Sequence, residues 1–193
     1  MLEHRSVRTY TEEKIGKEML MHLISCGQMA SSSSFIQAYS VIRVANLENR
    51  NKMFEITGNQ AWVKSAAEFL VLCADLTRVE DCCMREGDGL LLGHTEHFIT
   101  ATVDVALFAQ NILLAAESNG LGGVFIGGIR NKPEIVSDLL ELPDHVYPIF
   151  GLCIGRPEKK GQQKPRLPIS LIYHDEKYNN DKMERLLSRY DDE

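Results

Sequence analysis

The sequence predicts an α+β protein in which helices flank one sheet and one long apolar helix lies at the centre. Residues 68–74, EFLVLCA, form a continuous apolar run of strand length, which is typical of a central strand buried on both faces. Residues 100–119 carry apolar side chains nearly all round a helix, which indicates burial of that helix. The predicted helices and strands mix without strict βαβ alternation, so an α+β arrangement is favoured.

The first predicted elements lie before the buried strand. Residues 17–30 have apolar side chains at helical spacing, and the helix should stop at four serines, residues 31–34, which compete for backbone hydrogen bonds. Residues 39–45 are rich in Val and Ile and predict a strand. Residues 47–57 predict a second helix, and Gly58 suits the left-handed conformation that ends one.

After the long helix, which should end at Gly120, the chain returns to the sheet. Residues 123–126 predict a short strand. Residues 133–140 predict a helix with proline in its first turn, where the missing N–H costs nothing. Residues 147–154 predict the last strand.

Composition limits the class of protein. A chain of 193 residues that is 44% hydrophobic and 25% charged fits one globular domain with a proper core. A formal net charge of -6 argues against a nucleic-acid surface, which needs a broad basic face. The longest apolar stretch, residues 103–116, is interrupted by polar residues and predicts no membrane span. We therefore expect neither nucleic acid nor membrane as a partner.

The cysteines and histidines give no strong metal or catalytic signal. The five cysteines include no C-x-x-C pair, and no apolar leader follows Met1, so we expect reduced thiols in a cytoplasmic protein. The adjacent pair Cys82 and Cys83 could bind metal or form a disulfide, but neighbours on a helix point apart. His94 and His97 could ligate a metal, but a structural role is the simpler interpretation. We predict no metal site and find no catalytic triad.

Two basic clusters stand out in this acidic chain: HRSVR at residues 4–8 and RPEKKGQQKPRLP at residues 156–168. Lys164 and Arg166 flank a proline that keeps the segment extended. Together with Arg5 and a neighbouring serine hydroxyl they could form a phosphate pocket, since guanidinium groups bind phosphate with two hydrogen bonds. Taken singly, each cluster also fits a solvated surface or tail.

A glycine pair follows the predicted strand at residues 123–126. In FIGGIRN, residues 125–131, Gly127 and Gly128 would let a flat or charged ligand approach the backbone, although an ordinary turn is the alternative. The segment has neither the GxGxxG nor the GxxxxGK[ST] pattern, so nucleotide binding through those loops is unsupported.

Six motifs occur in order along the chain: HRSVR (4–8), SSSSFIQAYS (31–40), GNQ (58–60), AESNGLGGVFIGGIRN (116–131), GLCIGRP (151–157) and KPRLP (164–168). Together they resemble the FMN-dependent nitroreductase and flavin reductase family, in the branch of the oxygen-insensitive NADPH nitroreductase. The resemblance covers essentially the whole chain. It implies a nitroreductase-like fold over residues 1–193 as one FMN-binding domain: a mixed, mostly antiparallel sheet flanked by helices, with one long buried central helix.

The same resemblance implies roles for individual residues. The phosphate and ribityl chain of FMN would be held by His4, Arg5, Ser6, Lys164 and Arg166. The positive charge of Arg8 would face the pyrimidine end of the flavin and stabilise its reduced form. Ser32 and Gln60 would hydrogen-bond the flavin. The segment that packs along the ring would be Phe125, Ile126, Gly127 and Gly128, and Phe35 would line the acceptor side.

The implied activity needs no catalytic side chain, because the chemistry takes place at flavin N5. NAD(P)H would give hydride to FMN and leave, and nitro compounds, quinones or free flavin would then accept it, a ping-pong mechanism. The family implies a homodimer with FMN near the interface, which the serine loop would reach. Two alternatives stay open: a flavin-binding or storage protein with weak reductase activity, and a relative that uses reduced flavin for another reaction such as dehalogenation.

Residues 180–193 predict a last helix that finishes in three acidic residues. Acidic side chains are unfavourable at the negative end of the helix dipole, so we expect this helix to continue in a longer chain. In the resembling branch a C-terminal extension carries the basic residues that bind the NADPH phosphate. We therefore expect FMN binding together with a weak preference for NADPH over NADH.

Overall fold

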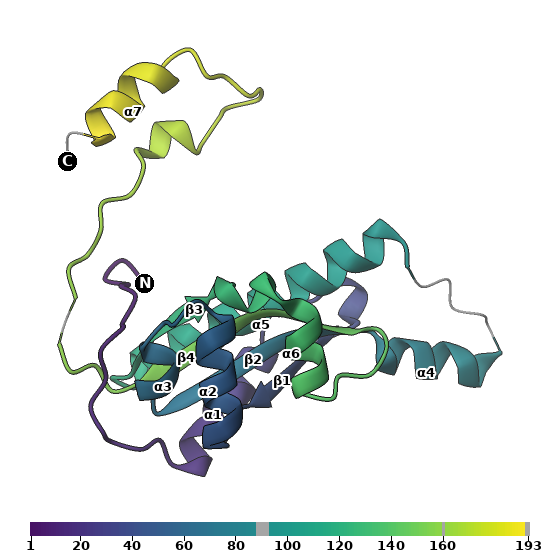
Figure 1. Cartoon of the computed structure of the whole chain (residues 1–193). Helices are drawn as coiled ribbons and strands as arrows, with labels where there is room; N and C mark the ends of the chain where they lie inside the picture. The colour runs from purple at the N-terminus through teal and green to yellow at the C-terminus, as the bar shows by residue number, and fades with distance from the viewer. Residues whose placement is uncertain (88–92, 160, 192–193) are drawn as a thin grey trace. The chain divides into compact units, whose positions relative to one another are not determined.

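The computed structural model describes residues 1–87, 93–159 and 161–191, and Figure 1 labels its helices and strands. The chain divides into two compact units. The first comprises Ser6–Lys160 with Met1, and the second comprises Leu2–Arg5 with Gly161–Glu193. The expectation of one FMN-binding domain over residues 1–193 stays a prediction.

The first unit is built on a four-stranded sheet with the order β1-β2-β4-β3. The strands are β1 (Tyr39–Arg43), β2 (Glu68–Asp75), β3 (Gly122–Ile126) and β4 (Val146–Gly155). Each neighbouring pair is antiparallel, with an irregularity in the β2–β4 register between Leu72 and Cys73. The predicted α+β class is confirmed, and among the described residues the sheet is wholly antiparallel where a mixed one was expected.

β2 is one of the two inner strands, and all eight of its residues are buried. Because side chains alternate along a strand, its residues divide between two hydrophobic clusters. Leu70, Leu72 and Ala74 belong to one cluster, whereas Phe69, Val71 and Cys73 belong to the other. The apolar run in the sequence therefore predicted this strand and its two-sided burial correctly.

Helices cover both faces of the sheet. The cluster that contains Leu70 includes residues of α1 (Lys17–Gln28) and α5 (Thr95–Ser118). The opposite cluster includes residues of α2 (Leu47–Ile56), α3 (Trp62–Ser65) and α6 (Pro133–Leu139). A further α-helix of this unit, α4 (Thr77–Glu86), buries none of its residues and extends beyond the end of the sheet (Figure 1).

α5 is the long central helix, and it starts five residues earlier than the sequence predicted. By length and composition alone, its 24 residues would be enough to cross a membrane, which the shorter apolar stretch at residues 103–116 did not indicate. In the fold it works as a core helix against α1. A Cβ at Gly27 would lie 2.7 Å from Ile112 and 2.8 Å from Phe108, so glycine lets the two helices pack closely.

One buried carboxylate in the sheet has a complete set of partners. Glu68 is 2% exposed and accepts hydrogen bonds from Arg43 Nε at 2.6 Å and Arg43 Nη2 at 2.7 Å. This two-pronged pairing offsets the cost of burying the charge.

The second unit combines the N-terminal segment with the C-terminal part of the chain. Arg5 Nη1 donates to the carbonyl oxygen of Gly161 at 3.3 Å, and Gln163 Nε2 donates to that of Leu2. The unit contains a short 3-10 helix, η3 (Ile169–Leu171), and α7 (Met183–Asp191). The predicted last helix is therefore present, while its two final residues lie outside the described range.

Asp75 is the last residue of β2, and its carboxylate accepts several hydrogen bonds. It accepts hydrogen bonds from the Ser40 hydroxyl, from Thr77 Oγ1 at 2.6 Å and N at 3.1 Å, and from Arg78 Nη1 at 2.9 Å. Burial alone would raise the pKa of Asp75, but the hydrogen bonds and the charge of Arg78 outweigh it and lower the pKa.

This lowered pKa predicts an acid-sensitive contribution to stability. Because the folded pKa lies below the unfolded value of about 3.9, the stabilisation is present above about pH 4 and is lost as pH falls further. We expect Asp75→Asn to lower the free energy of unfolding by about 1–3 kcal/mol at pH 6, with the difference narrowing toward pH 3. Urea denaturation at both pH values measures this, with the exposed Asp138→Asn as control. If the difference in unfolding free energy between the parent and Asp75→Asn does not change with pH, the lowered pKa of Asp75 is contradicted.

Candidate functional site

The part of the N-terminal basic cluster that belongs to the first unit, residues 6–8, is fixed to the sheet. Val7 N donates to the carbonyl oxygen of Gly123 on β3 at 2.9 Å, and the Tyr10 hydroxyl donates to that of Val7 at 2.6 Å. Val7 and Tyr10 are buried, while Ser6 and Arg8 are exposed. The chain thus runs beside β3 with its polar side chains directed outward.

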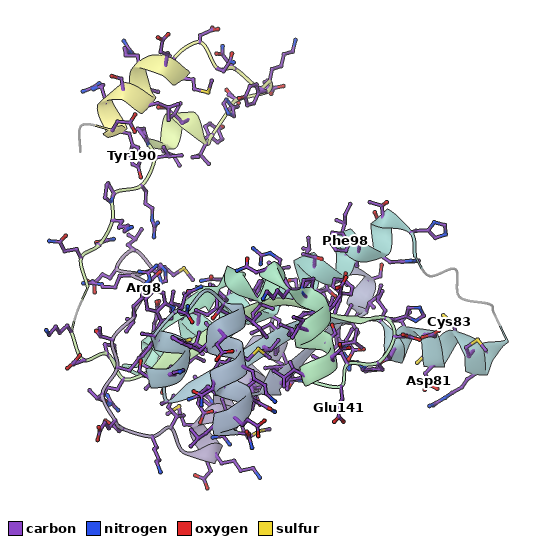
Figure 2. All side chains as sticks on the ribbon, viewed as in Figure 1. Arg8, Asp81, Cys83, Phe98, Glu141 and Tyr190 are labelled. Carbon is purple, nitrogen blue, oxygen red and sulfur yellow. The ribbon has the colours of Figure 1, made fainter. Side chains whose placement is uncertain are left out.

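Arg8 lies over the ring of Trp62, with its guanidinium carbon 5.6 Å from the ring centroid (Arg8 is labelled in Figure 2). Trp62 begins α3 and follows two residues after Gln60, whose Nε2 donates to the carbonyl oxygen of Thr57 at 2.8 Å. The fold therefore brings Arg8 beside the start of α3, next to the loop that carries Gln60. Trp62 Nε1 is buried and has no hydrogen-bond partner within the described residues.

The glycine pair packs against the same loop. Gly127 and Gly128 begin a 3-10 segment, η2 (Gly127–Asn131), directly after β3. A Cβ at Gly128 would lie 2.7 Å from the carbonyl oxygen of Thr57 and 3.1 Å from Gln60 Nε2, so the site requires glycine for close backbone contact. Residues 57–62 therefore contact two segments that are distant in the sequence: Gly128 packs against Thr57 and Gln60, and Arg8 lies over Trp62.

The rest of the predicted ring-packing segment lies on β3. Phe125 is half-buried and contacts Phe150 edge to face, with ring centroids 5.0 Å apart. Ile126 is fully buried in the core. A direct contact between the Ile126 side chain and a ligand would therefore need rearrangement, whereas its backbone adjoins the glycine pair.

The serine loop carries the predicted residues Ser32 and Phe35. Ser32 Oγ is buried and has no hydrogen-bond partner in the part of the chain that the structure describes. Phe35 is 80% exposed, which leaves its ring free to contact a substrate. Ser34, Phe35 and Gln37 have φ values of 48°, 56° and 56°, in the left-handed region that non-glycine residues rarely adopt.

The predicted phosphate cluster is split between the two units. Within the second unit, the hydrogen bonds of Arg5 and Gln163 hold residues 2–5 beside residues 161–163, so the two ends of the chain meet as the sequence suggested. Lys164 and Arg166 are exposed, and His4 is half-buried. Ser6 belongs to the first unit.

Sequence reasoning missed three charged residues that hold these segments. Arg130 Nη1 donates to the carbonyl oxygen of Ile149 at 2.7 Å and fastens the glycine turn to β4. Arg78 Nη2 donates to the carbonyl oxygens of Gln37 and Tyr39, at 3.2 and 2.6 Å. Asp104 of α5 accepts hydrogen bonds from the serine loop. A charge inside an apolar helix was the available signal for Asp104, because buried charges need partners.

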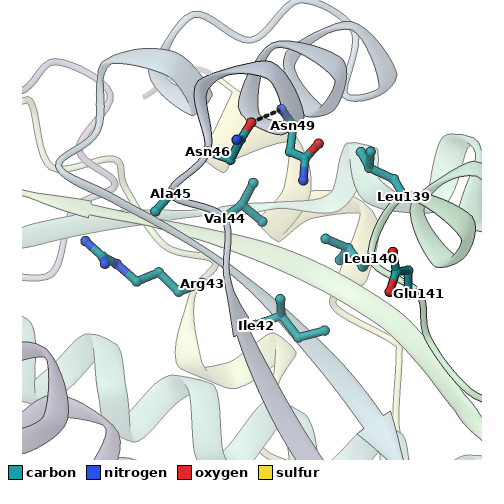
Figure 3. Close-up of a pocket in the computed structure, with 9 residues that line it drawn as sticks. All are labelled: Ile42, Arg43, Val44, Ala45, Asn46, Asn49, Leu139, Leu140 and Glu141. Atoms are coloured by element: carbon teal, nitrogen blue, oxygen red, sulfur yellow. Dashed lines mark hydrogen bonds between the residues drawn. The ribbon is translucent and has the colours of Figure 1, made fainter.

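A hollow of about 260 Å³ lies elsewhere on the first unit (Figure 3). None of its lining residues belongs to the predicted flavin or acceptor set; they are Ile42, Arg43, Val44, Ala45, Asn46, Asn49, Leu139, Leu140 and Glu141. Its polar groups are partly used within the protein, since Asn46 Oδ1 accepts from Asn49 N at 3.1 Å and Arg43 pairs with Glu68. We therefore assign no cofactor to this hollow.

The histidines and cysteines offer little for metal binding or for thiol chemistry. The rings of His94 and His97 lie 5.7 Å apart, and no group of three or more His, Cys, Asp or Glu that could hold a metal occurs within the described ranges. All five cysteines are free. Burial raises the pKa of the Cys73 and Cys153 thiols to about 12, so both are protonated and unreactive at neutral pH.

The contact between the glycine turn and the Gln60 loop can be tested directly. Gly128→Ala places a Cβ against the backbone of Thr57, whereas Gly127→Ala meets the Arg130 guanidinium at 3.1 Å, which can move. We expect Gly128→Ala to lower the free energy of unfolding by about 1–3 kcal/mol and Gly127→Ala to cost less. Gly16→Ala, with nothing within 4 Å of its Cβ position, is the control in the same urea titration. Equal losses in the two turn variants would refute the backbone clash.

The chain is similar to known proteins over nearly its whole length. The family model described as the nitroreductase family matches residues 1–156, and the one described as its C-terminal domain matches residues 164–193. The oxygen-insensitive NADPH nitroreductase of Salmonella typhimurium is 44% identical over 98% of this chain and 77% of its own. The FMN reductase (NADPH) of Bacillus subtilis is 41% identical over 99% of this chain and 78% of its own.

A solved structure supports the fold independently. The NADPH:FMN oxidoreductase of Vibrio harveyi, complexed with NAD+, superimposes with a TM-score of 0.93 at 41% identity and covers 99% of this chain and 81% of its own. With its fold and its segments matched over nearly the full length, the chain belongs to the nitroreductase family.

Proposed function

We propose that this protein is an FMN-dependent oxidoreductase that passes hydride from NAD(P)H to nitro compounds, quinones or free flavin. The observation that carries the proposal is that residues 57–62 contact both Arg8, through Trp62, and the Gly127-Gly128 turn, through Thr57 and Gln60. Membership of the nitroreductase family supports it, as do relatives at 41–44% identity that are named FMN reductase and NADPH nitroreductase.

The residues of the first unit fit a flat, electron-accepting cofactor. The glycine pair leaves backbone groups uncovered by side chains, which permits close approach of a ring. Ser32 Oγ and Trp62 Nε1 are buried with no partner among the described residues, so each retains hydrogen-bonding capacity. Arg8 adds a positive charge over the Trp62 ring.

When bound, FMN supplies the chemistry of taking up hydride and passing electrons to an acceptor. The protein's part is to bind and orient. Arg8 provides positive charge at the pyrimidine end, Ser32 and Gln60 donate or accept hydrogen bonds, and residues 125–128 pack along the ring. Phe35 offers an exposed apolar surface to the acceptor.

The phosphate and ribityl chain would be held by His4, Arg5, Ser6, Lys164 and Arg166. Supporting this assignment, Arg5 is anchored beside residues 161–163 through Gly161, and the neighbouring cations are exposed. A guanidinium group recognises phosphate oxygens with paired hydrogen bonds, which a solvated lysine does less specifically.

The test of the proposed function is reconstitution of the purified chain with FMN. Flavin absorbance that stays with the protein, bleaches with NADPH or NADH and returns with a quinone or nitro compound is the expected result. Comparing the rates of bleaching by the two nicotinamides measures donor preference. Stable flavin absorbance with very slow bleaching would favour the storage alternative, and a protein that takes up no FMN would overturn both.

The phosphate assignment predicts a local charge effect. Arg166→Ala should weaken FMN binding about tenfold, because a charge-assisted pair of hydrogen bonds is lost. Arg185→Ala, on α7, removes the same charge elsewhere in the second unit and should leave the dissociation constant unchanged. Quenching of FMN fluorescence on titration measures both, and equal weakening in the two variants would show a general charge effect.

Arg8 should act on reduction more than on binding. We expect Arg8→Ala to lower the reduction potential of bound FMN, since a positive charge near the flavin stabilises added electrons, while the dissociation constant changes less. A spectroscopic redox titration against a reference dye measures the potential. An unchanged potential with lost binding would reassign Arg8 to holding the cofactor.

We further propose that the protein is a homodimer with FMN near the interface. Support comes from α5, which leaves four large apolar side chains exposed although the helix forms part of the core: Phe98, Ile99, Val103 and Leu107 (Phe98 is labelled in Figure 2). A second copy related by a two-fold axis would bury this face.

Breaking this face should give monomers. Val103→Glu combined with Leu107→Glu places two charges in the proposed interface, and we expect a halved mass in sedimentation equilibrium at micromolar concentration. Ile135→Glu, an equally exposed apolar position on α6, is the control and should keep the parent mass. A dimer that persists in the double variant would place the interface elsewhere.

The cytoplasm is the compartment that we propose. All five thiols are free, which fits a reducing compartment.

A further inference from the structure

α5 carries a buried carboxylate whose two oxygens hold the two ends of the serine loop. Asp104 is 1% exposed. Its Oδ1 accepts a hydrogen bond from Ser33 N at 2.9 Å, and its Oδ2 accepts one from Ala38 N at 3.1 Å. One side chain thus fixes both ends of residues 33–38.

The loop needs this support because its backbone is strained. Ser34, Phe35 and Gln37 all have positive φ, and such conformations of non-glycine residues persist only where surrounding contacts impose them. Strained backbone of this kind is common at binding sites. Asp104 therefore maintains a conformation that the local sequence does not favour.

The two ends of the loop are not held equally. At its C-terminal end, Arg78 adds hydrogen bonds to the carbonyl oxygens of Gln37 and Tyr39. Among the described contacts, the link from Ser33 to the core runs through Asp104. Loss of Asp104 should therefore release the half of the loop that carries Ser32 and Phe35 more than the other half.

A carboxylate suits this position better than an amide. Both of its oxygens only accept, and both face backbone N–H donors. In asparagine one of the two positions becomes an NH₂ donor, which would face another donor. Asp104→Asn should thus keep the side-chain volume and lose one of the two hydrogen bonds.

We propose that Asp104 is a positioning residue that sets the placement of Ser32 and Phe35, and through them FMN affinity and the choice of acceptor by size. The inference rests on the proposed function, which gives Ser32 to the flavin and Phe35 to the acceptor side. Asp104 itself is buried beneath the loop and acts through it.

The experiment compares Asp104→Asn with Glu68→Gln in the FMN-loaded protein. Glu68 is an equally buried carboxylate with two hydrogen bonds, to Arg43, and serves as the matched control for a general loss of stability. Three kinds of measurement are made: amide exchange at Ser33 and Ala38, FMN titration for the dissociation constant, and steady-state kinetics for KM and kcat with p-benzoquinone and the larger menadione.

For Asp104→Asn we expect faster amide exchange, more at Ser33 than at Ala38, and an FMN dissociation constant raised about tenfold. The ratio of the KM values for menadione and p-benzoquinone should change about fivefold, with kcat changed less. Glu68→Gln should leave the amide exchange rates, the FMN dissociation constant and the ratio of KM values near those of the parent. Asp104→Glu, which keeps two acceptors but displaces them, should give intermediate values and serves if the asparagine variant does not fold.

Two results would overturn the inference: parent-like FMN affinity and acceptor ratio in Asp104→Asn, or equal changes in Glu68→Gln. Failure of the proposed function would be distinct, because the parent protein itself would then take up no FMN or pass no electrons to either quinone.

Discussion

The burial of β2 on both faces is the constraint on which the rest of the structure depends. A strand without a solvent face must be covered twice, so the fold requires helices on each side of the sheet. α1 and α5 cover one face of the sheet, and α2, α3 and α6 cover the other. The strand also pairs with β1 and β4 along its two edges, which leaves β3 at the outside of the sheet, next to the N-terminal segment.

The position of β3 explains where the candidate site lies. An edge strand offers unpaired backbone groups, and residues 6–11 cover part of this edge through Val7. The same contact brings Arg8 toward Trp62 and the Gln60 loop. The glycine turn then follows from the end of β3 itself. The position of the candidate site thus follows from how the edge of the sheet is covered. Arg8 comes from a segment that packs against β3, and the glycine pair follows β3 in the chain.

The sequence predicted the strands and most helices because their signals are local: apolar runs, helical spacing, and glycine or proline at the ends. It gave no bounds for α4, a ten-residue helix that buries none of its residues. The candidate residues came from the resemblance to a family, while their mutual contacts required the fold. The contacts of Asp104 and Arg130 could not be predicted from sequence. Asp104 binds backbone groups 66 and 71 residues away, and Arg130 binds one 19 residues away; a backbone group gives no side-chain signal in the sequence.

The position of Trp62 beside Arg8 makes its fluorescence useful for following cofactor binding. The chain contains a single tryptophan, and it stands among the proposed flavin-contacting residues. Its emission therefore comes from one known place, and an absorbing ring bound nearby would quench it by energy transfer. The protein in this way carries its own optical reporter, which can follow cofactor loading in unlabelled material.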